Sequence, residues 1–273
     1  MPTEKATFPG ASGRPLDARL DRPEGTPYAC AVLAHCFTCS RQTGAAARLS
    51  RALTEQGFGV LRFDFTGLGG GDEAGNADFA SNVEDLVAAA DWLRGRGIRP
   101  RLLVGHSLGG TAALVAAARI EEVEAVATIG APADPAHVQG LFADDLAAID
   151  EAGTARVSIA EGTFRIHGRL LRDLEEPRLL DVVRRLRKPL LLFHSPVDRV
   201  VPIDEARKIF EAAFHPKSFV SLDRADHLLS DPADVDYVAH VLAAWASRYL
   251  GGRAAPALEP GLEQEAPDVV RVE

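Results

Sequence analysis

Five short apolar runs, separated by stretches with helical periodicity, constrain the fold of this chain more than any other feature. They are Ala29–Ala34, Val60–Phe65, Leu102–Val104, Ala125–Ile129 and Leu190–Phe193. A strand that is apolar on both faces is typical of a parallel sheet, in which crossover helices cover both sides. The sequence therefore predicts an α/β domain with a mostly parallel central sheet flanked by helices.

Local signals predict further elements around these runs. Lys5–Phe8 and Pro15–Leu20 alternate in the manner of a short hairpin at the edge of the sheet. Gly57 is placed to end the helix that precedes the second apolar run. Ser81-Asn-Val-Glu84 matches a capping box that would begin a helix over Val83–Trp92.

The chain is expected to form one domain over residues 1–250, whose last element is an amphipathic helix at Val235–Leu250. An insert at about 133–188 lacks a sheet-core run, contains a hairpin pattern around Glu161-Gly162, and is interpreted as a small lid. Residues 251–273 hold three prolines and five acidic residues against two arginines. This composition predicts a flexible acidic tail or linker.

Composition and charge exclude several functional classes. Thirty Lys and Arg against 39 Asp and Glu give a net charge of −9, with no basic stripe for a nucleic-acid backbone. The first residues lack the pattern of a secretory signal, and no apolar run approaches the roughly 18 residues of a membrane span. Three cysteines do not make a disulfide framework. We expect a soluble cytoplasmic protein with reduced thiols.

The most informative motif is Gly105-His-Ser-Leu-Gly109, which lies between a predicted buried strand and a helix of small residues. This is the context of a nucleophile elbow, in which a tight turn presents the central serine at the carboxyl edge of the sheet. Side chains two residues either side of the serine would collide with the neighbouring strand and helix. Ser107 is therefore the predicted nucleophile, and the alternative is a surface serine in a glycine-bearing turn.

A serine hydroxyl needs a base to take its proton, and the base needs a carboxylate to hold its tautomer. Asp198 follows the last central run, and His227 follows the next predicted strand, so both lie at strand ends where loops converge on ligand. We predict Asp198 as the acid and His227 as the base. Asp134 is the alternative acid, and Asp226 is expected to point away from the site.

The sequence GHSLGG, the Asp198 loop and the ADH that ends at His227 give residues 5 to 250 a resemblance to the α/β-hydrolase superfamily. The resemblance implies a serine hydrolase that uses no cofactor and no metal. It also assigns the backbone N–H groups of Phe37 and Leu108 to an oxyanion hole. Cys36 stands where members of that superfamily commonly carry a glycine.

The segment Ala34-His-Cys-Phe-Thr-Cys-Ser40 leaves a second interpretation open. Cys30 is separated from Cys36 by about 20 Å of strand, which argues against a metal site that includes all three thiols. A Cys36-x-x-Cys39 pair, however, has the spacing of thiols that cycle between oxidation states. Cys36 and Cys39 are therefore retained as a redox pair, against the alternative that both simply pack beneath the loop.

A closer resemblance, carried by AHCFTCS, LRFDFTGLGG and AAWASRYL, is to the hydrolase half of bacterial proteins that fuse this domain to an OsmC-like domain. The expected function is hydrolysis of small-molecule esters with short to medium acyl chains. Peptidase, thioesterase and perhydrolase chemistry would use the same triad. The remaining alternatives are a non-catalytic or thiol-redox module that partners an OsmC-like domain. A homodimer is also considered, and neither nucleic acid nor membrane is expected as a partner.

Overall fold

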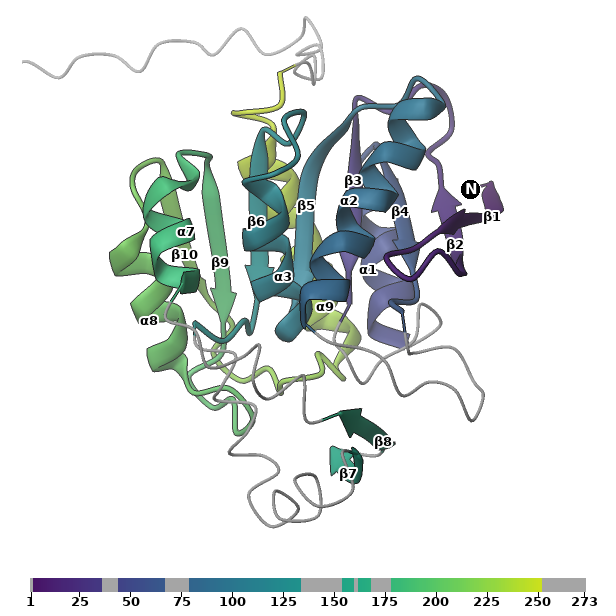
Figure 1. The fold of residues 1–273 in the computed structure, drawn as a ribbon. Coiled ribbons are helices and arrows are strands. Elements are labelled where there is room, and N and C mark those ends of the chain that lie inside the picture. Colours follow the sequence, from purple (N-terminus) through teal and green to yellow (C-terminus); the bar gives the residue numbers. More distant parts are fainter. Residues whose placement is uncertain are drawn as a thin grey trace, which may run out of the picture.

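The computed structural model describes residues 2–35, 44–66, 79–133, 154–159, 162–167 and 178–251. Its centre is an eight-stranded sheet in the order β1-β2-β4-β3-β5-β6-β9-β10 (Figure 1). The strands are β1 Thr3–Pro9, β2 Pro15–Asp21, β3 Ala29–Ala34, β4 Phe58–Phe63, β5 Pro100–His106, β6 Ala125–Ile129, β9 Leu190–His194 and β10 Lys217–Ser221.

Within this eight-stranded sheet, only the first two strand pairings are antiparallel. β1 pairs with β2 and β2 pairs with β4 in this way, whereas all pairings from β4 to β10 are parallel. The predicted edge hairpin and mostly parallel sheet are both confirmed. The strands β3, β4, β5, β6, β9 and β10 run in one direction. The loops that follow them therefore gather at one edge of the sheet.

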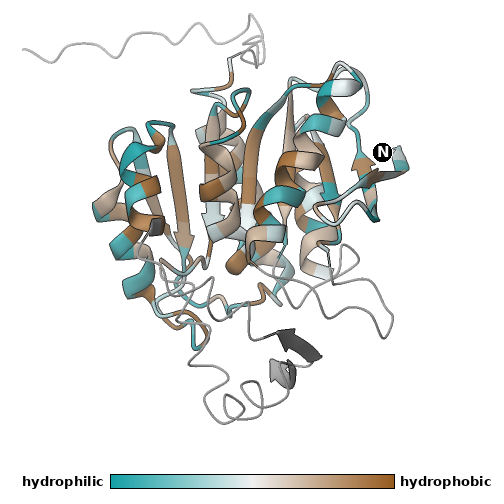
Figure 2. Cartoon of the chain, in the orientation of Figure 1, coloured by the Kyte–Doolittle hydropathy of each residue, from teal (hydrophilic) through white to brown (hydrophobic). Residues whose placement is uncertain are grey.

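Helices cover both faces of the sheet (Figure 1). One face carries α2 Phe79–Gly95, α3 Leu108–Ala117, α7 Arg178–Leu186 and α8 Ile203–Ala212, and the other carries α1 Gly44–Glu55 and α9 Pro232–Ala246. Successive strand residues such as Val32 and Leu33 point into opposite cores. Figure 2 shows β5 and β9 in hydrophobic colours, whereas α7 and α8 carry many hydrophilic residues. This burial of both strand faces explains their continuous apolar sequence.

The predicted capping box at Ser81–Glu84 is wrong, because α2 begins at Phe79 and both residues lie inside the helix. The first turns of α2 are instead fixed by tertiary hydrogen bonds. The buried Asp85 carboxylate accepts from the backbone N–H of Ala11 at 2.7 Å and of Thr66 at 2.6 Å. Asp85, which follows the predicted box, thus ties α2 to two neighbouring loops.

The last helix is displaced from its predicted bounds. It begins at Pro232, after Asp231 accepts a hydrogen bond from Ala233 N at 2.9 Å as the N-cap. It ends at Ala246, although Leu250 remains fully buried. The apolar pattern therefore continued past the helix because the following turn also packs against the core. None of the helices in the described ranges is long and apolar enough to span a bilayer.

The predicted insert divides into two parts of different character. The hairpin expected around Glu161-Gly162 is formed by β7 Thr154–Ile159 and β8 Gly162–His167, which pair antiparallel. Helix α7 also falls within 133–188, but its residues Leu179, Val183 and Leu186 are buried in the main core. The last part of the insert is therefore part of the helical layer. Residues 134–153, 168–177 and the predicted tail from 252 onward lie outside the described residues.

The buried Asp21 carboxylate on β2 forms an ion pair with Arg62 on β4 and a hydrogen bond with Ser50 on α1. The Arg62 Nε–H donates to Asp21 Oδ2 at 2.8 Å, and the hydroxyl groups of Ser50 and Thr3 donate to the same carboxylate at 2.5 and 2.6 Å. Burial alone would raise the pKa of Asp21, but these hydrogen bonds outweigh it and lower the pKa below its ordinary value. The charge on Asp21 therefore stabilises the fold.

We expect Asp21→Asn to lower the free energy of unfolding near pH 7 by about 3 kcal/mol, because Arg62 loses its buried partner. Wild type should also lose stability as the pH falls from about 4 through the lowered pKa of Asp21, since the unfolded chain binds the proton more readily. Asp21→Asn should lack this component. Urea unfolding across pH 2.5 to 7, with Asp17→Asn on the exposed face of β2 as control, measures both effects. Equal acid sensitivity in wild type and Asp21→Asn would contradict the assignment.

Candidate active site

Ser107 occupies the turn between β5 and α3. Its backbone lies at φ 54° and ψ −132°, a region that residues with a side chain rarely adopt. Ser107 N donates to Ile129 O on β6 at 2.8 Å, and the Ser107 carbonyl accepts from Gly110 N at 2.8 Å. Neighbouring backbone thus holds the serine in a strained conformation at the carboxyl edge of the sheet.

The glycines of the motif allow backbone to touch backbone. A Cβ on Gly105 would lie 2.4 Å from the Gly109 carbonyl oxygen, and one on Gly109 would lie 2.5 Å from the His35 carbonyl oxygen. Both contacts are with main-chain atoms, which cannot rotate away. A side chain at either position would therefore collide with the helix or the strand, as the sequence predicted, and only glycine fits.

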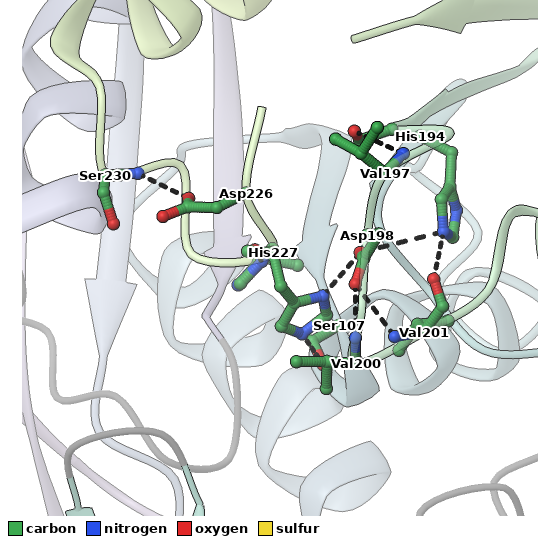
Figure 3. Close-up of polar contacts among 11 residues, drawn as sticks. Ser107, His194, Val197, Asp198, Val200, Val201, Asp226, His227 and Ser230 are labelled. Atoms are coloured by element: carbon green, nitrogen blue, oxygen red, sulfur yellow. Dashed lines mark hydrogen bonds and ion pairs between the residues drawn. The ribbon is translucent and has the colours of Figure 1, made fainter. Parts of the chain in front are cut away.

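The three predicted catalytic residues meet at this edge (Figure 3). His227 Nδ1 lies 2.7 Å from Asp198 Oδ2, and His227 Nε2 lies 2.9 Å from Ser107 Oγ. A carboxylate can only accept, so Nδ1 carries the proton and Nε2 is left to accept from the serine hydroxyl. The side chains of His227 and Asp198 are 8% and 2% exposed, so water competes little with these bonds.

Asp198 is held in its charged form by hydrogen bonds. Besides His227, the backbone N–H groups of Val200 and Val201 donate to Asp198 Oδ1 at 2.8 and 2.9 Å (Figure 3). Burial tends to raise the pKa of Asp198, but the bonds from His227 and from these two N–H groups keep it below its ordinary value. The carboxylate is therefore ionised at neutral pH and fixes the orientation of the His227 ring.

Two further histidines border the site, and sequence reasoning did not assign either to it. His194 Nε2 lies 2.8 Å from Val201 O and 3.8 Å from Asp198 Oδ2, while His106 Nε2 lies 2.6 Å from His227 O. Burial lowers the pKa of both histidines, that of His106 to about 3 with the neighbouring His227 contributing. Their only sequence signal is adjacency, because His106 precedes Ser107 and His194 opens the Asp198 loop.

Some of the other residues considered for the site lie in the described part of the chain, and some do not. Leu108 is the first residue of α3, so its N–H has no carbonyl partner within the helix. Asp226 turns away and accepts from Ser230 N at 2.8 Å, as expected. Phe37, Cys36, Cys39 and Asp134 lie outside the described residues.

Burial raises the pKa of the remaining thiol, Cys30, to about 12, so it is not a reactive group at neutral pH. Among the parts of the chain that are described, no cluster of His, Cys, Asp or Glu is arranged to bind a metal ion.

Residues 31–258 match the alpha/beta hydrolase family. The match spans most of the chain and includes all three residues that meet at the elbow. The chain belongs to the alpha/beta hydrolase family. Its mostly parallel sheet flanked by helices is the predicted architecture, and Ser107 directly follows β5.

Similar proteins give this hydrolase its context. The solved esterase domain of a Rhodothermus marinus protein is 50% identical, with a TM-score of 0.78, and the match covers 92% of this chain and all of that domain. Human protein ABHD12B is 30% identical over 172 residues, 61% of this chain. Mouse mitochondrial palmitoyl-protein thioesterase ABHD10 is 29% identical over 187 residues, 66% of this chain. The hydrolase spans only 44% and 62% of the lengths of these two relatives.

The elbow geometry predicts a sharp contrast between two glycines of this hydrolase. Gly109→Ala should leave little folded protein, or lower the free energy of unfolding by more than about 3 kcal/mol, because its Cβ would overlap main-chain atoms of β3. Gly95→Ala, at the exposed end of α2 with open space around it, should be neutral or stabilising by up to about 1 kcal/mol. Thermal and urea unfolding of both variants would measure this, and similar stabilities would contradict the close approach of α3 to β3.

Proposed function

We propose that this alpha/beta hydrolase is a serine carboxylesterase that cleaves esters of short to medium acyl chains through an acyl-enzyme. The observation that carries the proposal is the unbroken hydrogen-bonded chain from Asp198 through His227 to Ser107. An activated nucleophile needs a base within hydrogen-bond reach and a third group that orients the base. Both requirements are met, and the three residues come from separate loops.

In the proposed reaction, Ser107 Oγ attacks the ester carbonyl carbon while its proton passes to His227 Nε2. Asp198 stabilises the resulting imidazolium through the Nδ1–H bond. The tetrahedral intermediate collapses as the bond to the alcohol oxygen breaks, and His227 Nε2–H protonates that oxygen. Water then attacks the acyl-enzyme by the same route, which releases the carboxylic acid and restores Ser107.

The oxyanion of both intermediates requires donors that are fixed before the reaction begins. Leu108 N–H at the start of α3 is one proposed donor, and the positive end of the helix dipole adds to it. Phe37 N–H is the second, assigned by the resemblance to the family. Loss of one such donor in hydrolases usually lowers kcat by about 100-fold to 1,000-fold.

The preference for esters rests on the related esterase domain from Rhodothermus marinus, since half of its aligned residues are identical to those of this chain.

The insert at 133–188, without its core helix α7, is proposed as a small lid. The hairpin β7–β8 belongs to this proposed lid.

Thioester hydrolysis is the second candidate, because one of the relatives is named as a palmitoyl-protein thioesterase. The same triad serves both reactions, since attack on the carbonyl carbon differs only in the leaving atom. A direct comparison of matched oxyesters and thioesters would separate the two.

We expect wild type to hydrolyse p-nitrophenyl esters from acetate to decanoate, with an optimum at the short or medium acyl lengths. Ser107→Ala should lower kcat by at least about 10⁴-fold, because the nucleophile is removed. Ser247→Ala, near the end of α9, provides a matched control that should retain full activity. A fluorophosphonate should label wild type and Ser247→Ala stoichiometrically and leave Ser107→Ala unlabelled.

Activity that is unchanged in Ser107→Ala would contradict the serine mechanism. A kcat/KM at least tenfold higher for acyl thioesters than for the matched oxyesters would instead favour the second candidate. The double substitution Cys36→Ser with Cys39→Ser should leave ester hydrolysis intact, whereas its loss would support a role for the thiols.

A further inference from the structure

An apolar cavity of about 60 Å³ lies on the face of the sheet covered by α1 and α9, and the ring of His106, one of its lining residues, lies 5.1 Å from the ring of His227 between their centroids. It is lined by Ala45, Ala46 and Leu49 of α1 and by Leu228 and Leu229, the two residues that follow His227. By the same measure a single water needs roughly 10–15 Å³. The cavity is therefore large enough for a small alkyl group.

The two histidines in the wall do not make this cavity polar. His35 Nε2 lies 2.7 Å from Phe63 O, and His106 Nε2 lies 2.6 Å from His227 O. Because a carbonyl oxygen can only accept, each Nε2 carries a proton that is already used in these bonds. Leucine and alanine side chains make up most of the remaining wall. The lining therefore favours an apolar group over a sugar or a charged group.

The position of the cavity relative to His227 indicates which part of an ester would enter it. In the proposed reaction the leaving oxygen must come within hydrogen-bond distance of His227 Nε2, while the acyl carbon stays on Ser107. The leaving group therefore extends on the His227 side of the serine. Leu228 and His106, the direct chain neighbours of the base and the nucleophile, both line the cavity.

One lining residue of the cavity, Leu229, has a strained backbone conformation. Leu229 has φ 52°, which is rare for a residue with a branched side chain, and it is nevertheless 3% exposed. Its N–H donates to Asp226 O at 3.2 Å, and Asp226 in turn accepts from Ser230 N. This tight turn directs Leu229 into the cavity two residues after the proposed base. Such strain is frequent where a ligand is contacted.

We propose that this cavity is the subsite for an apolar leaving group, so that the preferred substrates are esters of small aliphatic alcohols. The inference rests on the proposed function. It assigns selectivity for the alcohol part to α1 and the turn after His227. Selectivity for the acyl part must then be set elsewhere.

The test compares two ester series by kcat/KM. One series extends the alcohol, from methyl to hexyl acetate, and the other extends the acyl chain, from methyl acetate to methyl hexanoate. Ala45→Phe fills the cavity, and Ala47→Phe is the matched control, since Ala47 lies on the same helix, is also half-buried, and does not line the cavity. Leu228→Ala enlarges the cavity and provides the opposite change if Ala45→Phe fails to fold.

We expect Ala45→Phe to lower kcat/KM for butyl and hexyl acetate by about tenfold relative to methyl acetate, with the acyl series unchanged. Leu228→Ala should shift the optimum to longer alcohols, and Ala47→Phe should match wild type. A change confined to the acyl series would overturn the proposal, as would no change in either series.

A binding measurement separates this inference from the proposed function. Saturation-transfer NMR with 1-butanol should detect binding to wild type, Ser107→Ala and Ala47→Phe, and lose it in Ala45→Phe. This result would support the subsite even if p-nitrophenyl acetate were not hydrolysed, in which case the proposed function alone would fail. Equal binding to Ala45→Phe and Ala47→Phe, or no binding to wild type, would overturn the subsite.

Discussion

The close approach of α3 to the ends of β3 and β5 determines the rest of the site. Gly105 and Gly109 lack the Cβ atoms that would hold these backbones apart, so the turn between them can project Ser107 beyond the sheet. The parallel strands then bring the Asp198 and His227 loops to the same edge. A triad drawn from three distant parts of the chain thus depends on one contact between main chains.

Four ionisable side chains lie at this edge of the sheet: Asp198, His106, His194 and His227. Asp198 keeps its negative charge because three donors point at it, whereas burial lowers the pKa of His106 and His194 and keeps them neutral. A second cation here would oppose the imidazolium that the proposed reaction forms on His227. The neutral rings instead support the backbone of the two loops, through Val201 O and His227 O.

Much of this arrangement could be predicted from residues with a strong local signal. Continuous apolar runs gave the strands, and the elbow with its strand-end carboxylate and histidine gave the three residues that meet. Tertiary contacts were harder to predict. The sequence of Ser81–Glu84 matches a capping box but lies inside α2, whereas the next residue, Asp85, forms hydrogen bonds with two loops. Likewise, the cavity beside His227 is formed by α1 and a strained leucine turn that are far apart in sequence, and no spacing rule relates them.

The strained backbone at Ser107 also has an evolutionary consequence. Glycine adopts φ 54° without the steric penalty that serine incurs, so the fold itself would be more stable with glycine at this position. Selection for stability alone would therefore tend to remove the hydroxyl group, and only selection for its chemistry opposes that drift. In descendants that no longer need the reaction, this serine should be among the first residues of the elbow to be replaced.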